Sequence, residues 1–206
     1  MAALIDSLIS AALQVGIVLL IAWLAYWPLR GKAKPSFVTF LGLGTTRPLA
    51  LLIGVVIGVA GAVAWLMLPG MAAIAKSPGS VVADALKGGV TPEALTALAV
   101  TGAVKSALSE EILFRGLIGK RLYAWIGLTG GNLVQALLFG AIHLVLLLAL
   151  HGPLEAAAGF AAFTTLFSLA AGLLNEKLGK GAIWPGWALH ASANLTTALL
   201  LAFGDL

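Results

Sequence analysis

Six polar residues that could take part in acid–base chemistry stand inside apolar stretches of this sequence. They are Glu110, Glu111, Arg115, His143, His190 and Asn194. An ionisable side chain in such surroundings is costly unless it is paired or lines a wet cavity, so each of these residues needs a reason. Carboxylates and imidazoles can move protons, and amides and imidazoles can donate hydrogen bonds to a developing negative charge. This set is therefore compatible with acid–base chemistry that activates a water.

Helical spacing separates the two adjacent glutamates. In an α-helix, Glu111 and Arg115 lie on one face, about 40° apart, whereas Glu110 points about 140° away from Arg115. We therefore expect Arg115 to neutralise Glu111 and leave Glu110 free to face a cavity. His190 and Asn194 have the same i, i+4 spacing and present two polar groups on one helix face.

The composition indicates the elements that must position these side chains. Hydrophobic residues make up 61% of the 206 residues, charged residues only 10%, and the mean hydropathy is +1.06. A soluble domain carries about a quarter charged residues, so the natural solvent of this chain is lipid. The 25 glycines suit close helix packing in a bilayer, as does the Gly54–Gly58 pair. The predicted fold class is all-α, a polytopic transmembrane helix bundle.

Apolar stretches of about 20 residues predict about six membrane spans. They cover residues 4–27, 48–68, 94–117, 132–150, 154–174 and 182–203. The turn-rich segment 69–92 is predicted to be an external loop with room for a short helix, and segment 32–46 has room for an interfacial helix.

The basic residues predict the orientation of these spans. Nine of the twelve lie at the end of, or after, the first, third and fifth spans: Arg30, Lys32, Lys34, Arg47, Arg115, Lys120, Arg121, Lys177 and Lys180. Lys76 and Lys87 fall in the opposite loop, and Lys105 lies within the third span. The positive-inside rule then places both termini outside. In this interpretation, the basic residues behind the net charge of +4 set the orientation of the chain in the membrane. No nucleic-acid partner is expected, because there is no basic face or recognition module.

The predicted depths of three of these residues agree. Counted from presumed cytoplasmic helix ends near residues 119, 131 and 181, Glu110 lies roughly 14 Å deep, His143 roughly 18 Å and His190 roughly 14 Å. We therefore expect them to share one pocket, and Phe139, one turn before His143, to wall it. The chain has no Cys, which excludes thiolate nucleophiles and Cys-ligated metals.

Three motifs resemble those of the CPBP family, which comprises the type II CAAX prenyl endopeptidases and the bacteriocin-processing or Abi proteins. SEEILFRG (109–116) resembles the family's EExxxR motif, FGAIHL (139–144) its FxxxH motif, and GAIWPGWALHASAN (181–194) its HxxxN motif. The motifs stand in family order, and the resemblance covers about residues 94–203. We therefore divide the chain into an N-terminal transmembrane region with two spans (1–93) and a CPBP/Abi-like catalytic core (94–206).

The resemblance implies an intramembrane endopeptidase whose pocket opens to the cytoplasmic side. By motif position, Glu110 is the general base that activates water, assisted by His143. His190 and Asn194 match the residues that stabilise the oxyanion, and Glu111 and Arg115 match the supporting pair. The implied partners are membrane lipid and a membrane-associated or prenylated peptide or protein, in a bacterial or archaeal cell membrane.

Metal dependence and two other functions stay open on the sequence. Glu110, His143 and His190 could supply three ligands to a catalytic zinc, but they come from three different helices and no HExxH pair is present. We expect no required cofactor, with zinc as the alternative. A non-catalytic membrane scaffold or immunity-type protein on the same fold is the first alternative function, and a small transporter with a proton relay is the second.

Overall fold

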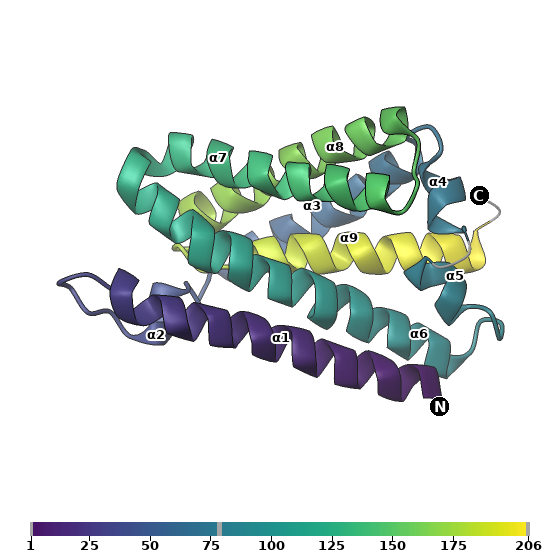
Figure 1. Cartoon of the computed structure of the whole chain (residues 1–206), viewed down its shortest axis with the longest axis horizontal. Coiled ribbons are helices and arrows are strands. Elements are labelled where there is room, and N and C mark those ends of the chain that lie inside the picture. Colours follow the sequence, from purple (N-terminus) through teal and green to yellow (C-terminus); the bar gives the residue numbers. More distant parts are fainter. Residues whose placement is uncertain (1, 78–79, 205–206) are drawn as a thin grey trace.

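The computed structural model describes residues 2–77 and 80–204, and the chain is a bundle of long helices with no strand in these segments (Figure 1). Six rods lie side by side. The first rod is α1 (Ala2–Leu29) and the second is α3 (Pro48–Leu66). The third combines α6 (Pro92–Ala99), η1 (Val100–Leu108), η2 (Glu111–Gly119) and the start of α7 (Lys120–Ala149), and the rest of α7 forms the fourth. The fifth is α8 (Leu154–Leu173) with η3 (Leu174–Leu178), and the sixth is α9 (Trp184–Phe203). The six rods correspond to the six apolar segments that the sequence predicts.

The connector between the third and fourth rods differs from the prediction. Helix continues past residue 117, and the chain turns back at Ile126 and Gly127, where Gly127 has φ 77° and ψ 166°. The basic residues do not end the helix because they find partners within the protein. Lys120 Nζ bonds Glu176 Oε1 at 2.5 Å, and Arg121 Nη2 donates to Phe40 O at 2.7 Å.

Three short helices fill the segments that were expected to hold such elements. α2 (Phe37–Phe40) is a single turn, capped by Ser36, whose Oγ accepts from Thr39 N. Segment 69–92, which was predicted to be an external loop, holds α4 (Met71–Ala75) and α5 (Val81–Ala85).

Within the described part of the chain, four helices are long and apolar enough to cross a membrane: Ala3–Leu29, Pro48–Leu66, Pro92–Ala149 and Leu154–Leu178. Pro92–Ala149 contains the Gly127 bend and therefore supplies two of the six rods. α9 falls outside this set because polar residues such as His190 and Asn194 interrupt its apolar sequence. Large apolar side chains on the outside of the bundle, such as Leu13 and Leu24, are more than 60% exposed in the protein alone. The chain is a multi-pass integral membrane protein.

The two ends of the bundle differ. α2, the Gly127 bend and the η3–α9 connection lie at one end, on the left of Figure 1. Eight basic residues gather there, and we call it the basic end: Arg30, Lys32, Lys34, Arg47, Lys120, Arg121, Lys177 and Lys180. The ninth predicted member, Arg115, lies inside the bundle with a side chain only 2% exposed. The start of α1, the end of α9, α4 and α5 lie at the other end, which we call the terminal end.

The Gly54–Gly58 pair packs α3 against α9, as the spacing predicts. A Cβ at Gly54 would collide with Pro185 O, and one at Gly58 with Ser192 Oγ and Leu189 O. Ser192 Oγ also donates to Val55 O at 3.3 Å. The two backbones can come this close only because both positions lack a side chain, and this contact holds the helix that carries His190 and Asn194 in place.

Gly58→Ala should therefore destabilise the protein. Overpacking against a rigid backbone costs about 1–3 kcal/mol, which corresponds to a melting temperature roughly 3–10 °C lower in detergent. Gly159→Ala on α8 is the matched control, because nothing lies within 4 Å of its Cβ position. The control should be neutral or slightly stabilising. Equal melting temperatures for Gly58→Ala and wild type would contradict this packing.

Candidate active site

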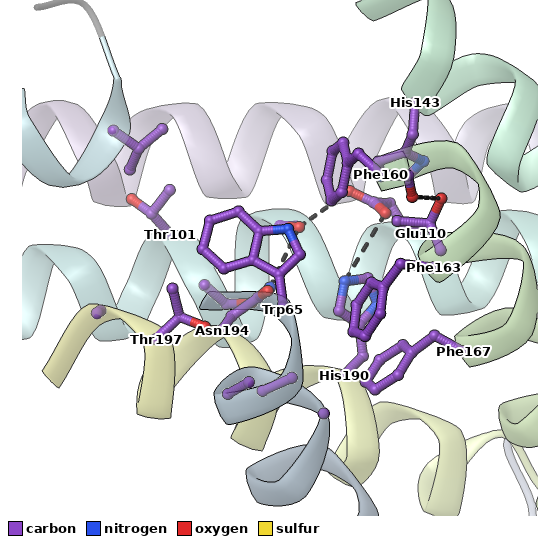
Figure 2. A pocket seen from close by; sticks show the side chains of 18 of the residues that line it. Trp65, Thr101, Glu110, His143, Phe160, Phe163, Phe167, His190, Asn194 and Thr197 are labelled. Atoms are coloured by element: carbon purple, nitrogen blue, oxygen red, sulfur yellow. Dashed lines mark hydrogen bonds and ion pairs between the residues drawn. The ribbon is translucent and has the colours of Figure 1, made fainter. Parts of the chain in front are cut away.

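Four of the six polar residues line one cavity of about 340 Å³ (Figure 2). Glu110 comes from the junction of η1 and η2, His143 from α7, and His190 and Asn194 from α9. Aromatic rings form much of the wall, among them Trp65, Phe139, Phe160, Phe163 and Phe167. The structure thus brings together the residues that were predicted to share a pocket, and places Phe139 in its wall.

The helix that carries the glutamates is wider than the α-helix assumed from the sequence. Residues 100–108 and 111–119 are π-helical, with bonds of the i→i+5 type. Three carbonyls of η1 accept bonds from side chains of neighbouring helices. Gly102 O accepts from Asn194 Nδ2 at 3.0 Å, Ala103 O from Trp187 Nε1 at 2.8 Å, and Lys105 O from Gln14 Nε2 at 3.0 Å. α1 and α9 therefore hold the widened helix in this form.

Glu111 and Arg115 form the predicted ion pair. Arg115 Nη1 lies 2.8 Å from Glu111 Oε1, and the two side chains are 2% and 0% exposed. The guanidinium also lies over the Phe139 ring, with its carbon 4.6 Å from the ring centroid. Neither residue lines the cavity. The two residues form a buried ion pair beside the cavity, in which the positive charge of Arg115 compensates the negative charge of Glu111.

Glu110 has the opposite environment. Its side chain is 24% exposed and lines the cavity. Ser106 Oγ donates to Glu110 Oε1 at 2.9 Å, and Glu110 Oε2 lies 3.9 Å from His190 Nε2. Glu110 is therefore a carboxylate at a cavity wall with one donor on one oxygen and a histidine near the other.

The two histidines differ in their contacts. His190 lies between the glutamates, because its Nδ1 is 3.5 Å from Glu111 Oε1 while its Nε2 faces Glu110. His143 Nδ1 lies 2.8 Å from Phe139 O. A carbonyl only accepts, so Nδ1 carries the hydrogen and Nε2 of a neutral His143 is left as an acceptor.

Asn194 connects the cavity wall to Glu110. Its Nδ2 donates to Gly102 O and, at 3.4 Å, to Ser106 Oγ, which in turn donates to Glu110. The contact between Ser106 and Glu110 was not predicted from the sequence. Ser106 lies four residues before Glu110, so the i, i+4 spacing could have indicated this contact.

A second missed residue, Asn175, anchors α9. It is 1% exposed, and its Oδ1 accepts from Gly186 N at 2.7 Å in the first turn of α9. A Cβ at Gly186 would lie 2.6 Å from Glu111 Oε2, so α9 approaches the ion pair closely. An isolated Asn near a helix end carries no signal for this contact in the sequence.

The cavity occupies the half of the bundle toward the terminal end. From Glu110 it passes Ser106 and Thr101 to Leu98, and from His190 it passes Asn194 to Ala198. Val81 of α5 lines it at the terminal end. The charge pattern predicts that this end faces the outside, whereas the family resemblance implies a pocket that opens to the cytoplasm. Both expectations stay predictions.

A comparison with known families agrees with this arrangement. A family model described as Type II CAAX prenyl endopeptidase Rce1-like matches residues 92–196, just over half of the chain. The chain belongs to this Rce1-like family. The match runs from the start of α6 into α9 and includes all six predicted site residues. No curated protein and no solved structure gave a match.

Membership in the Rce1-like family supports an intramembrane endopeptidase at the level of the family. The roles of the individual side chains, and the division of the chain into 1–93 and 94–206, stay predictions.

The donor set does not fit a metal ion in this arrangement. Among residues 2–77 and 80–204, no group of three or more His, Asp or Glu side chains is placed to hold one. Glu110, His143 and His190, the set considered for zinc, do not form such a group. The expectation that no cofactor is required stays a prediction.

The two glutamates should differ in their effect on stability. Glu111→Gln leaves the buried Arg115 without its counter-charge, which costs about 3–5 kcal/mol. Glu110→Gln is an isosteric change at a partly exposed side chain and should leave the melting temperature in detergent nearly unchanged. The measurement is thermal unfolding of both variants, with membrane expression yield as a second readout for Glu111→Gln. A larger loss for Glu110→Gln would contradict the pairing.

A second experiment addresses the metal directly. We expect purified protein to contain no stoichiometric metal by elemental analysis, and chelation to leave activity unchanged. In the zinc alternative, about one zinc per chain is expected, and His190→Ala should lose metal and activity together. Activity that is lost on chelation and restored by zinc would overturn our expectation.

Proposed function

We propose that this protein is an intramembrane endopeptidase in which Glu110 activates the water that cleaves a peptide bond. The observation that carries the proposal is the contrast between the two glutamates. Glu110 lines the cavity with 24% of its side chain exposed, whereas Glu111 is fully buried against Arg115. Membership in the Rce1-like family supports the same reaction class.

The reaction needs one base and one set of hydrogen-bond donors. The Glu110 carboxylate takes a proton from water, and the water oxygen forms a bond to the carbonyl carbon of the substrate. The carbonyl oxygen becomes an oxyanion in the tetrahedral intermediate. The carbon–nitrogen bond then breaks as the protonated Glu110 returns the proton to the leaving nitrogen, which yields an amine and a carboxylic acid.

The neighbouring side chains have complementary roles in this proposal. Nε2 of neutral His143 accepts a hydrogen bond from the attacking water and so assists Glu110. His190 and Asn194 stabilise the oxyanion. Asn194 can exchange its longer bond, the one to Ser106 Oγ at 3.4 Å, for a bond to the oxyanion and still keep the bond to Gly102 O.

The cavity wall is consistent with a membrane-associated substrate. Trp65, Phe163 and Phe167 provide large apolar surfaces around Glu110. Such a wall suits apolar side chains or a prenyl chain and would disfavour a charged side chain without a partner. The substrate we propose is therefore a membrane-associated or prenylated peptide or protein.

Cleavage of a library of internally quenched peptides in detergent tests this function. Glu110→Gln should abolish turnover because the amide cannot accept the proton from water. Asn194→Ala should lower kcat about 10²–10³-fold, the usual loss for one oxyanion donor.

Gly159→Ala serves as the activity control, because Gly159 does not line the cavity and nothing lies within 4 Å of its Cβ position. Retention of most activity by Glu110→Gln would show that another group is the base. A peptide library left intact by wild-type protein under all conditions would favour the non-catalytic alternative.

A further inference from the structure

One polar side chain stands in the apolar middle of α1. Apart from Gln14, residues 11–22 are Ala, Leu, Val, Gly and Ile. α1 packs along α6, η1 and η2, while side chains on its other faces, such as Leu13 and Ile17, are more than half exposed in the protein alone (Figure 1). An amide among lipid chains is costly unless it is hydrogen-bonded, so Gln14 needs partners within the bundle.

Gln14 finds these partners on the helix that carries the glutamates. Its Nε2 donates to Lys105 O at 3.0 Å and to Ser109 Oγ at 2.9 Å, which uses both hydrogens of the amide. Ser109 is 1% exposed and directly precedes Glu110, and its hydroxyl donates to Lys105 O. Gln14 therefore ties α1 to a carbonyl of η1 and to the residue next to Glu110.

The local form of this helix decides which glutamate faces the cavity. Glu110 lines the cavity, whereas its neighbour Glu111 pairs with Arg115 outside it. Neighbouring residues of a helix differ in direction by about 100°. A π turn holds about one residue more than an α turn, so the conversion of a single turn of η1 would rotate the following residues by about the same angle. Such a rotation would take the Glu110 carboxylate away from the cavity.

The bonds from α9 do not replace those of Gln14. Asn194 and Trp187 bond the carbonyls of Gly102 and Ala103, near the start of η1. A change of turn between Ala103 and Glu110 would leave both of these bonds intact. The bonds of Gln14 lie within this interval and oppose such a change.

We propose that Gln14 is a positioning residue, which holds η1 in the π-helical form that directs Glu110 into the cavity. This inference rests on the proposed function, and it adds α1 to the catalytic unit. Gln14 does not line the cavity, so it acts through the helix and not on the substrate. It also lies outside residues 92–196, the part of the chain that matches the Rce1-like model, and outside the predicted core of 94–206.

The kinetics of purified variants test this role, with a quenched peptide that wild type cleaves in detergent as the probe. Gln14→Leu removes both donated bonds at a similar side-chain size. The value of kcat should fall roughly 10–10²-fold, because a small misplacement of a reacting group has a cost of that order. KM should stay unchanged, since Gln14 does not contact the cavity.

Ser10→Ala is the matched control for Gln14→Leu. Ser10 lies one turn earlier on α1, and its Oγ donates to Ser7 O of the same helix at 3.2 Å. This variant should keep the kcat of wild type. An unchanged kcat for Gln14→Leu, or a loss confined to KM, would overturn the proposal.

A second variant keeps the test independent of the folding of Gln14→Leu. Ser109→Ala removes the hydroxyl that accepts from Gln14 and leaves the bond to Lys105 O in place. It should lower kcat by less than Gln14→Leu does. The double variant should be no worse than Gln14→Leu, because both changes act through one contact. Additive losses would contradict the proposal.

The position of Glu110 can also be measured without turnover. Dicyclohexylcarbodiimide is an apolar reagent that adds to protonated carboxyl groups within membranes, and peptide mass spectrometry locates the adduct. In wild type, Glu110 should be modified, whereas Glu111, buried against Arg115, should stay unmodified. Gln14→Leu should slow the modification of Glu110 severalfold, and Ser10→Ala should not. Equal rates in wild type and Gln14→Leu would overturn the proposal.

The two hypotheses fail in different ways. Absence of cleavage by wild type in detergent would count against the proposed protease function, whereas the carbodiimide rates would still report whether Gln14 directs Glu110 into the cavity. Cleavage by wild type, with equal kcat and equal modification in Gln14→Leu, would count against the role of Gln14 alone.

Discussion

The buried ion pair between Glu111 and Arg115 is the constraint on which the rest of the site depends. Two charges with almost no exposed surface must compensate each other, and breaking such a pair is far more costly than losing an exposed one. The pair contacts two neighbouring helices: Phe139 of α7 lies against Arg115, while His190 and Gly186 of α9 lie beside Glu111. The positions of α7 and α9 around the π-helical rod are therefore set by a contact that itself takes no part in the proposed chemistry.

The π-helical form of residues 100–108 and 111–119 follows from the same close packing. Bonds of the i→i+5 type are less favourable than those of an α-helix, so a long π-helical stretch needs support from its neighbours. Gln14, Trp187 and Asn194 supply it through bonds to Lys105 O, Ala103 O and Gly102 O. Asn194 therefore lines the cavity and also stabilises the helix that carries Glu110. Changes at Asn194 will alter the shape of this helix as well as the hydrogen bonds it offers to a substrate.

Much of this architecture could be predicted from the sequence, because the length of an apolar stretch and the spacing of polar residues along a helix determine local structure. The six rods, the close packing at Gly54 and Gly58, and the pairing of Glu111 with Arg115 follow from such rules. The helix beyond residue 117 was missed because the partners of Lys120 and Arg121 come from distant segments. The contact of Ser106 with Glu110 could also have been predicted, because the two residues have the same i, i+4 spacing as Glu111 and Arg115. The π-helix, the role of Asn175 and the direction of the cavity depend on tertiary contacts that one sequence does not reveal.

The depth of Glu110 imposes a condition on any substrate. Inside a bilayer a backbone keeps its carbonyls bonded within its own helix, so a transmembrane helix offers no free carbonyl to an attacking water. A segment must unwind before its peptide bond can reach Glu110, and the freed backbone groups then need partners in the cavity. Polar groups stand along the wall between Glu110 and the terminal end, at Thr101, Asn194 and Thr197, while the surrounding rings of Trp65 and Phe163 keep the remaining surface apolar. In the proposed reaction, the polar groups of this wall pair with the freed backbone of a short extended peptide, and the apolar rings limit the access of bulk water to the bond, which is the environment in which oriented donors have their greatest effect.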